Sequence, residues 1–201
     1  MKAYILLLLA LIAFSGCSDR PVITDNSTVV VQPGLGISNV CAVGMTYEQI
    51  RKATGDAALV EQGPWSFKRL IPWRRKDRFV FVPSLCARIP FASGRINYWI
   101  TFQVTTNDWN QIPFRGRIGE KLSFKDGPVS RAQVEAALGP IKTNFTSANP
   151  FPNIYLAREP FAIERGQGLV NLFYTRLGLY ITLSNNVVTE FSTMTVFPSN
   201  Q

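Results

Sequence analysis

The sequence predicts an α+β protein of two tandem modules, each a short helical piece followed by an antiparallel β-meander. Two observations predict this fold class. A ten-residue segment, 46–55, aligns without gaps on 130–139, and both have the features of a short helix. Stretches with the composition of β-strands follow each segment, which is an α+β arrangement. After an N-terminal leader and tether, about 160 residues remain, which is enough for one core or two small ones.

The first sixteen residues have the layout of a secretory signal, with Lys2 ahead of an apolar run that ends at Phe14. This run is too short for a permanent transmembrane helix, which needs about 20 apolar residues. The sequence Phe14-Ser15-Gly16-Cys17 resembles the bacterial lipobox, in which cleavage leaves the cysteine as a lipid-bearing N-terminus. The resemblance implies a signal peptide over 1–16 and lipidation of Cys17. Ordinary signal cleavage with an unmodified Cys17 is the alternative.

The residues after Cys17 bear on the location of the protein. Two or more acyl chains hold a protein stably at a membrane. Ser18 resembles the residue at this position in lipoproteins sorted to the outer membrane, so we expect the periplasmic face of the bacterial outer membrane. Asp19 keeps the inner membrane open as an alternative. Residues 17–40 are rich in proline, glycine and polar residues, which predicts a flexible tether. Val29 to Val31 could instead add an edge strand to the body.

The two aligned segments carry matching helix signals. Each begins with a hydroxyl residue, Thr46 or Ser130, and has a glutamine three residues later, which is a capping box. Apolar or small side chains at i, i+3 and i+4 give each helix one buried face. These side chains are Ile50, Ala53 and Thr54 in the first segment and Val134, Ala137 and Leu138 in the second. Gly55 and Gly139 follow at positions suited to left-handed backbone. Chance similarity of two short helices is the alternative.

The strand predictions rest on alternation and turn residues. We expect strands over 65–71, 78–82 and 95–105 after the first helix, and over 169–175, 178–183 and 187–197 after the second. Alternation places Tyr98, Ile100, Phe102 and Val104 on one face, and Leu177, Leu179, Ile181 and Leu183 on another. Asn185-Asn186 predicts a tight hairpin turn, because asparagine tolerates positive φ. The proline-rich segment 142–167 predicts either a short strand or a long surface loop.

Cys41 and Cys86 are the cysteines that remain beside Cys17. In an oxidising periplasm, a single remaining pair predicts a disulfide. Closing a loop of about 45 residues would stabilise the fold by about 4 kcal/mol in the chain-entropy model. Two buried free thiols are the alternative. Neither cysteine lies in a Cys-x-x-Cys motif, so we expect no metal site and no redox role.

The absence of histidine from the sequence restricts the possible chemistry. It excludes the Ser-His-Asp triad, the Cys-His dyad and His-ligated zinc. Aspartate and glutamate are scattered singly, and no glycine-rich phosphate-binding motif occurs. We therefore expect a protein that is not an enzyme and has no cofactor. A carboxylate-dependent hydrolase that uses Glu120, Asp126 or Glu135 is the alternative.

The pattern Gly44-Met45-Thr46-x-x-Gln49-Ile50-x-x-x-x-Gly55 is similar to the signature of small outer-membrane lipoproteins of the SmpA/OmlA type, components of the β-barrel assembly machinery. The same helix-plus-sheet module, in tandem, builds the β-lactamase inhibitor protein. The total length departs from that of the lipoprotein family and, with the internal repeat, predicts two modules, over 41–118 and 119–201. The resemblance implies a non-enzymatic scaffold or adaptor whose sheet or loops bind another envelope protein.

Charge gives a second functional hypothesis, because the chain has a formal net charge of +8. Basic and aromatic residues are interleaved in segment 65–78, including Lys68, Arg69, Trp73, Arg74, Arg75, Lys76 and Arg78. This mixture suits an anionic surface such as the cell wall, lipopolysaccharide or lipid headgroups. A solvated hairpin tip is the alternative. Similar segments bind single-stranded nucleic acid, but the expected periplasmic location gives no reason to expect nucleic acid here.

Overall fold

The structure is a computed structural model that describes residue 23 and residues 25–62, 77–92, 95–96, 99–105, 113–146 and 159–195. Its helices are η1 (Asn26–Thr28), α2 (Tyr47–Thr54), η3 (Pro83–Leu85), α3 (Arg131–Leu138) and η4 (Thr175–Leu177), where η denotes a 3₁₀-helix. Its short strands are β1 (Val30–Val31), β2 (Gly36–Ile37), β3 (Cys41–Ala42), β7 (Arg95–Ile96), β9 (Arg117–Ile118) and β10 (Leu122–Ser123). None of the described helices has the length and apolar character needed to cross a membrane.

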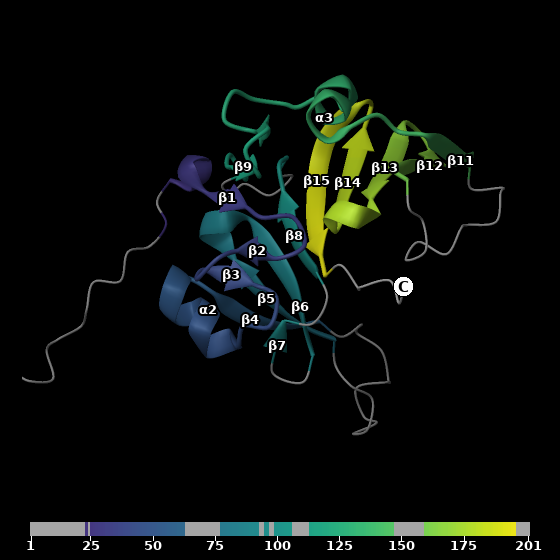
Figure 1. The fold of residues 1–201 in the computed structure, drawn as a ribbon. Helices are drawn as coiled ribbons and strands as arrows, with labels where there is room; N and C mark the ends of the chain where they lie inside the picture. Colours follow the sequence, from purple (N-terminus) through teal and green to yellow (C-terminus); the bar gives the residue numbers. More distant parts are fainter. Residues whose placement is uncertain are drawn as a thin grey trace, which may run out of the picture.

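The remaining nine strands form the path of one large sheet in the order β11-β12-β13-β14-β15-β8-β6-β5-β4 (Figure 1), and β7 joins the same sheet by pairing antiparallel with β6. They are β4 (Ala58–Gln62), β5 (Asp77–Val82), β6 (Ala87–Ala92), β8 (Trp99–Gln103), β11 (Thr143–Thr146), β12 (Phe161–Gly166), β13 (Leu169–Tyr174), β14 (Leu179–Ser184) and β15 (Val187–Met194). β11 runs parallel to β12, and the other neighbours in this order are antiparallel. The predicted α+β class is confirmed.

Strands β8 and β15 join the two halves of the chain in the middle of this sheet. They pair antiparallel, with Thr101 opposite Ser192 and Phe102 opposite Phe191. The hydroxyl oxygens of Thr101 and Ser192 are 2.8 Å apart, within hydrogen-bonding distance. The rings of Phe102 and Phe191 stack with centroids 5.0 Å apart on the opposite face. The halves therefore share one sheet and contribute to one core.

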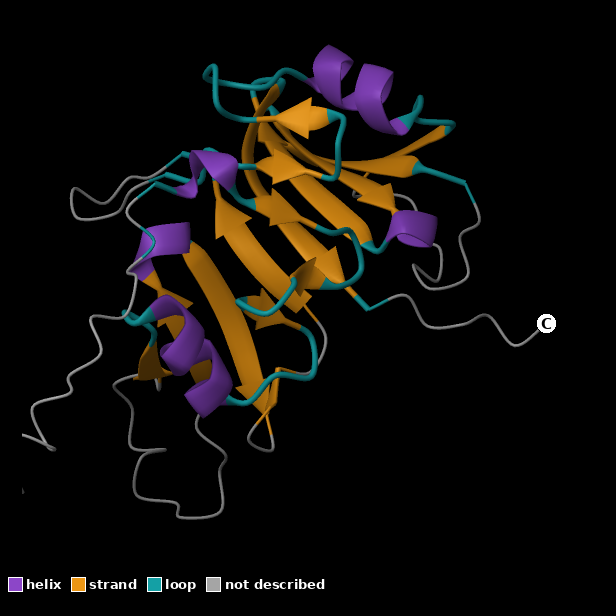
Figure 2. Cartoon of the chain, turned by 60° about the vertical axis from the view of Figure 1, so that its left-hand side comes forward, coloured by secondary structure: helices purple, strands orange, loops and turns teal. Residues whose placement is uncertain are grey.

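Both α-helices pack on the same face of the large sheet, together with η1 and the small sheets β1-β9-β10 and β2-β3 (Figure 2). One hydrophobic cluster contains Ile50 from α2 and Val134 from α3, both fully buried. It also contains alternate residues of the sheet strands, such as Val80 and Ile181. Burying these side chains contributes about 1.5–3 kcal/mol each, which is why both helices lie over this face.

The helix signals are confirmed in most details. Thr46 accepts a hydrogen bond from the Gln49 amide, and Ser130 accepts one from the Gln133 amide, each within a complete capping box. Gly55 has the left-handed backbone expected of it, with φ 78°. Gly139 differs, because its φ of 104° comes with a ψ of 155°, outside the left-handed helical region.

The strand predictions are confirmed in part, and the predicted strand over 65–71 and the predicted position of Tyr98 lie outside the described residues. Ile100 and Phe102 are fully buried as alternation predicts, and Asn185 and Asn186 form the predicted turn with φ 50° and 64°. The prediction for Leu177 is wrong, because η4 takes it out of the strand and leaves it 39% exposed. The segment 142–167 contains β11 and β12. Strand β6 was not predicted, because Pro90 interrupts its apolar pattern.

Residues 25–40 belong to the body, so the prediction of a flexible tether over 17–40 is wrong for this stretch. Asn26 is 3% exposed, and its amide nitrogen donates to the carbonyl oxygens of Ser84 (3.1 Å) and Pro113 (3.2 Å). Its side-chain oxygen accepts from the Arg115 amide at 2.8 Å. Val31 is fully buried in β1, which pairs parallel with β9. The alternative, in which this stretch adds a strand to the body, is therefore correct for Val30–Val31. The strand belongs to the small sheet β1-β9-β10 and not to the large sheet.

Candidate functional site

The face of the large sheet opposite the α-helices is the candidate site, and we call it the outer face. It carries the strand residues that alternate with the core residues. One row of directly opposed residues crosses this face, from Arg88 on β6 to Thr101 on β8, Ser192 on β15 and Tyr180 on β14. Its other members near the centre of the sheet are Phe79, Phe81, Trp99, Gln103 and Met194. Because β8 and β15 are central, this row spans both halves of the chain.

Among the described residues of the outer face, the most exposed aromatic side chain is Trp99, at 44%. It lies on β8 opposite Met194 of β15. On the neighbouring strands, the Arg88 guanidinium lies over the Phe79 ring, 4.3 Å from its centroid. This is a cation–π contact, which holds the arginine against the sheet. A cavity of about 260 Å³ opens beside this pair, lined by Val60, Phe79, Phe81, Cys86, Arg88 and Gln103.

The second half of the outer face carries an aromatic cluster across β11 to β14. Phe145 packs edge-on to Phe161, with ring centroids 5.6 Å apart. Phe161 stacks on Phe173 at 4.7 Å, and Phe173 contacts Tyr180 at 4.9 Å. Phe161 and Phe173 are buried, whereas Tyr180 is half-buried. Burial raises the pKa of the Tyr180 hydroxyl, so it stays protonated and can donate a hydrogen bond.

Cys41 and Cys86 are both buried, and no disulfide joins them in the structure. Burial raises the pKa of Cys41 to about 12 and that of Cys86 to about 11, so both are thiols at neutral pH. Cys41 belongs to the core on the helix side, whereas Cys86 lines the cavity of the outer face and its sulfur lies 4.0 Å from Gln103 Oε1. The two thiols thus lie in different environments. The disulfide between Cys41 and Cys86 stays a prediction.

Several predicted site residues lie outside the described residues. They are the lipidation residue Cys17 and the basic-aromatic residues Lys68, Arg69, Trp73, Arg74, Arg75 and Lys76. Arg78 belongs to β5 by its backbone. Binding of an anionic surface through 65–78 therefore stays a prediction.

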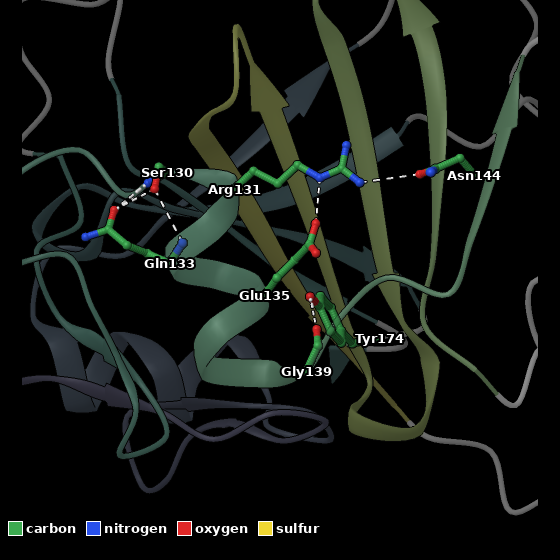
Figure 3. A network of polar contacts seen from close by, with 7 residues as sticks. All are labelled: Ser130, Arg131, Gln133, Glu135, Gly139, Asn144 and Tyr174. Atoms are coloured by element: carbon green, nitrogen blue, oxygen red, sulfur yellow. Dashed lines mark hydrogen bonds and ion pairs between the residues drawn. The ribbon is translucent and has the colours of Figure 1, made fainter.

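The carboxylates considered for hydrolysis lie on different elements. Glu135 on α3 accepts from Arg131 Nε at 2.6 Å, and Arg131 Nη2 donates to Asn144 Oδ1 at 3.4 Å (Figure 3). Tyr174 on β13 donates its hydroxyl to the Gly139 carbonyl at 3.0 Å. These contacts attach α3 to β11 and β13, which is a structural role for Glu135. Burial, followed by the nearby Glu135 charge, raises the pKa of Tyr174 to about 12, which keeps this donor protonated.

The other two carboxylates are exposed: Glu120 lies between β9 and β10, and Asp126 lines an open groove of about 650 Å³ beside α3. Within the part of the chain that the structure describes, no three His, Cys, Asp or Glu side chains gather as a metal site would need.

Comparison with protein families, with curated proteins and with solved structures finds no match to this chain.

Proposed function

We propose that this protein is a non-enzymatic, lipid-anchored envelope protein that binds another protein through its outer face. The observation that supports this most is the one-sided packing of the sheet. Both α-helices and the small sheets lie on one face, and aromatic and arginine side chains lie on the other, where Trp99 is 44% exposed.

The side chains of the outer face suit a protein partner. Tryptophan, tyrosine, phenylalanine, methionine and arginine are the residues enriched in protein interfaces, and tryptophan and arginine dominate their binding energy. Trp99 and Met194 lie together in the middle of the sheet, and Arg88 is held against Phe79 on a nearby strand. The part of this face that is open lies around β6 and β8, where Arg88 and Trp99 are exposed. On the second half of the sheet, Phe161, Phe173 and Ser192 are buried, so the proposed contact centres on Trp99.

We further propose that the two halves are copies of one module, as the tandem prediction states. Thr46 and Ser130 have the same cap geometry, with φ −82° and ψ 162°. The β5–β6 connection is a three-residue 3₁₀-helix followed by a positive-φ residue, Cys86, and the β13–β14 connection repeats this with Gly178. In this reading β8 and β15 are equivalent last strands, and their pairing creates the broad central surface.

The proposed location follows from the N-terminal sequence. The signal-like segment 1–16, the lipobox-like approach to Cys17 and the following Ser18 support anchoring at the periplasmic face of the outer membrane. A partner is then another envelope protein. This agrees with the adaptor role that the resemblance to the SmpA/OmlA type implies.

Position-specific photo-crosslinking in intact cells tests this function. The acylated protein would carry a photoreactive amino acid in place of Trp99 and, in a matched control, in place of Leu177, which is 39% exposed in η4 at the end of the strands. We expect a discrete protein adduct from position 99, and we expect Arg88→Ala to reduce it. Equal adducts from both positions, or none from position 99, would overturn the proposal.

A further inference from the structure

The described chain enters the body at a fixed point. Asn26 is held by three hydrogen bonds, to Ser84, Pro113 and Arg115. The backbone of Asn26 also packs closely against Gly116, because a Cβ on Gly116 would lie 2.9 Å from the Asn26 carbonyl oxygen. The Arg117 amide also donates to the Val29 carbonyl at 2.8 Å. These contacts fix the backbone from Asn26 onward to the body.

This fixed point limits the distance between the body and a lipid on Cys17. Nine residue steps separate Cys17 from Asn26, and they span at most about 32 Å whatever their conformation. η1 contacts the η3 turn between β5 and β6, in the first half of the sheet. The β11 edge lies six strand positions from β6, a distance of about 29 Å. The chain would have to extend along almost the whole body before that edge could reach the membrane.

Cationic side chains surround the entry point. Arg115 donates its amide to Asn26, and the exposed Arg117 lies opposite Val30 in the β1–β9 pair. The exposed Lys125 lies close enough to Asp25 to interact with its carboxylate. That carboxylate already accepts hydrogen bonds from the amide and hydroxyl of Ser27, at 2.8 and 2.9 Å. The described residues around the entry point thus carry the cations of Arg115, Arg117, Lys121 and Lys125 and the carboxylates of Asp25, Glu120 and Asp126. Cations are in excess, and the Asp25 carboxylate is already hydrogen-bonded.

We infer that the side of the body formed by η1, β1 and β9 rests against the membrane that holds the acylated Cys17, with Arg115, Arg117 and Lys125 toward anionic lipid headgroups. This inference rests on the lipid anchor in the proposed function. It gives the anchored protein one membrane-facing side and directs the β11 edge away from the lipid. Basic residues near an anionic surface are attracted within a Debye length of about 8–10 Å, so the contact weakens as salt rises.

The test places a fluorophore at single introduced cysteines in the full acylated protein, reconstituted in vesicles with anionic lipids and a quencher on the headgroups. Arg117→Cys and Lys125→Cys report on the proposed near side, Thr146→Cys on β11 reports on the far edge, and Trp99→Cys reports on the outer face. The parent chain, with its buried Cys41 and Cys86, gives the labelling background. We expect strong quenching at 117 and 125 and weak quenching at 146 and 99.

Two further variants separate the effect of the short N-terminal leash from the effect of the basic side chains. Inserting ten Gly/Ser residues after Asp19 should reduce the difference between near and far positions, because the leash then reaches around the body. Replacing Arg117 and Lys125 by glutamine, with the fluorophore at Ser123→Cys of β10, should lower quenching in anionic but not in zwitterionic vesicles. Unchanged quenching in that pair would overturn the headgroup contact.

The failure of this inference can be told from the failure of the proposed function. Equal quenching at all positions, or the strongest quenching at 146 or 99, would overturn the inference while leaving the adduct at position 99 intact. Mass spectrometry that shows no acyl group on Cys17 would instead remove the anchor on which both depend.

Discussion

Asn26 connects the N-terminal segment to two distant parts of the body, so its replacement should have a large effect. Asn26→Ala removes three hydrogen bonds and leaves the Arg115 amide and the carbonyl oxygens of Ser84 and Pro113 without this partner. At about 1 kcal/mol for each bond, and more for a buried group left unpaired, the free energy of unfolding should fall by about 2–4 kcal/mol. Urea unfolding of the full chain with Cys17→Ser, which avoids the acyl chains, measures this value.

Two further variants test whether the loss of stability comes from the hydrogen bonds of the Asn26 side chain. Thr28→Ala changes an exposed residue of the same short helix and should alter the free energy of unfolding by less than about 0.5 kcal/mol. Asn26→Asp keeps the acceptor for Arg115 but places an oxygen against two carbonyl groups, so it should destabilise as Asn26→Ala does. If Asn26→Ala unfolds at the same urea concentration as the parent chain, the reasoning about this fixed point is refuted.

Three other predictions concern the helices, the turns and the thiols. Thr46→Ala and Ser130→Ala should each lower the free energy of unfolding by about 1 kcal/mol in urea titrations, because each removes a capping box; no loss in either would contradict the assigned caps. Cys86→Gly should be about 1 kcal/mol more stable than Cys86→Ala, because both variants lose the buried sulfur and only glycine adopts the φ of 47° freely. Gly178→Ala, at the corresponding φ of 63°, should destabilise the fold by a similar amount, and effects of the opposite sign would reject the equivalence of the two turns. Burial raises the pKa of Cys41 from 9.0 to about 12, so the thiol ionises first in the unfolded chain. The free energy of unfolding should then fall as pH rises above about 9, by up to about 1.4 kcal/mol per pH unit for each such thiol. Cys41→Ala should make this slope shallower and leave the part due to Cys86, whose pKa burial raises to about 11, and an unchanged slope would contradict the burial of the Cys41 thiol. If the denatured parent chain shows no thiols, the two cysteines form the disulfide instead.

Local signals in the sequence were sufficient for the helices and for much of the second half of the sheet. Thr46 and Ser130 identify both helix starts because a capping box depends on residues only three positions apart. Alternation around Ile100 and Phe102 also identifies the side of β8 that is buried. The same alternation places Trp99 on the other side of the strand, but it cannot show that both helices cover one face.

The features that alternation and capping do not reveal depend on distant contacts. Asn26 lies in a polar, glycine- and proline-containing stretch typical of a linker, yet its partners lie 58, 87 and 89 positions away in the sequence. Strand β6 contains Pro90, which lowers its local strand signal, and neighbours on both sides determine its conformation. The outer face spans both halves of the chain because β8 pairs with β15. Neither strand's sequence predicts that the other is its partner.

The most direct test of the proposed interaction surface is the affinity of the partner captured by the position-99 crosslink. Calorimetric titration of that purified partner would compare the parent protein with Trp99→Ala and with the matched Leu177→Ala variant. Trp99→Ala should weaken binding at least tenfold, about 1.4 kcal/mol, as truncation of a central aromatic contact does, while Leu177→Ala leaves the affinity unchanged. Equal affinities for all three proteins would contradict the assignment of the outer face as the binding surface.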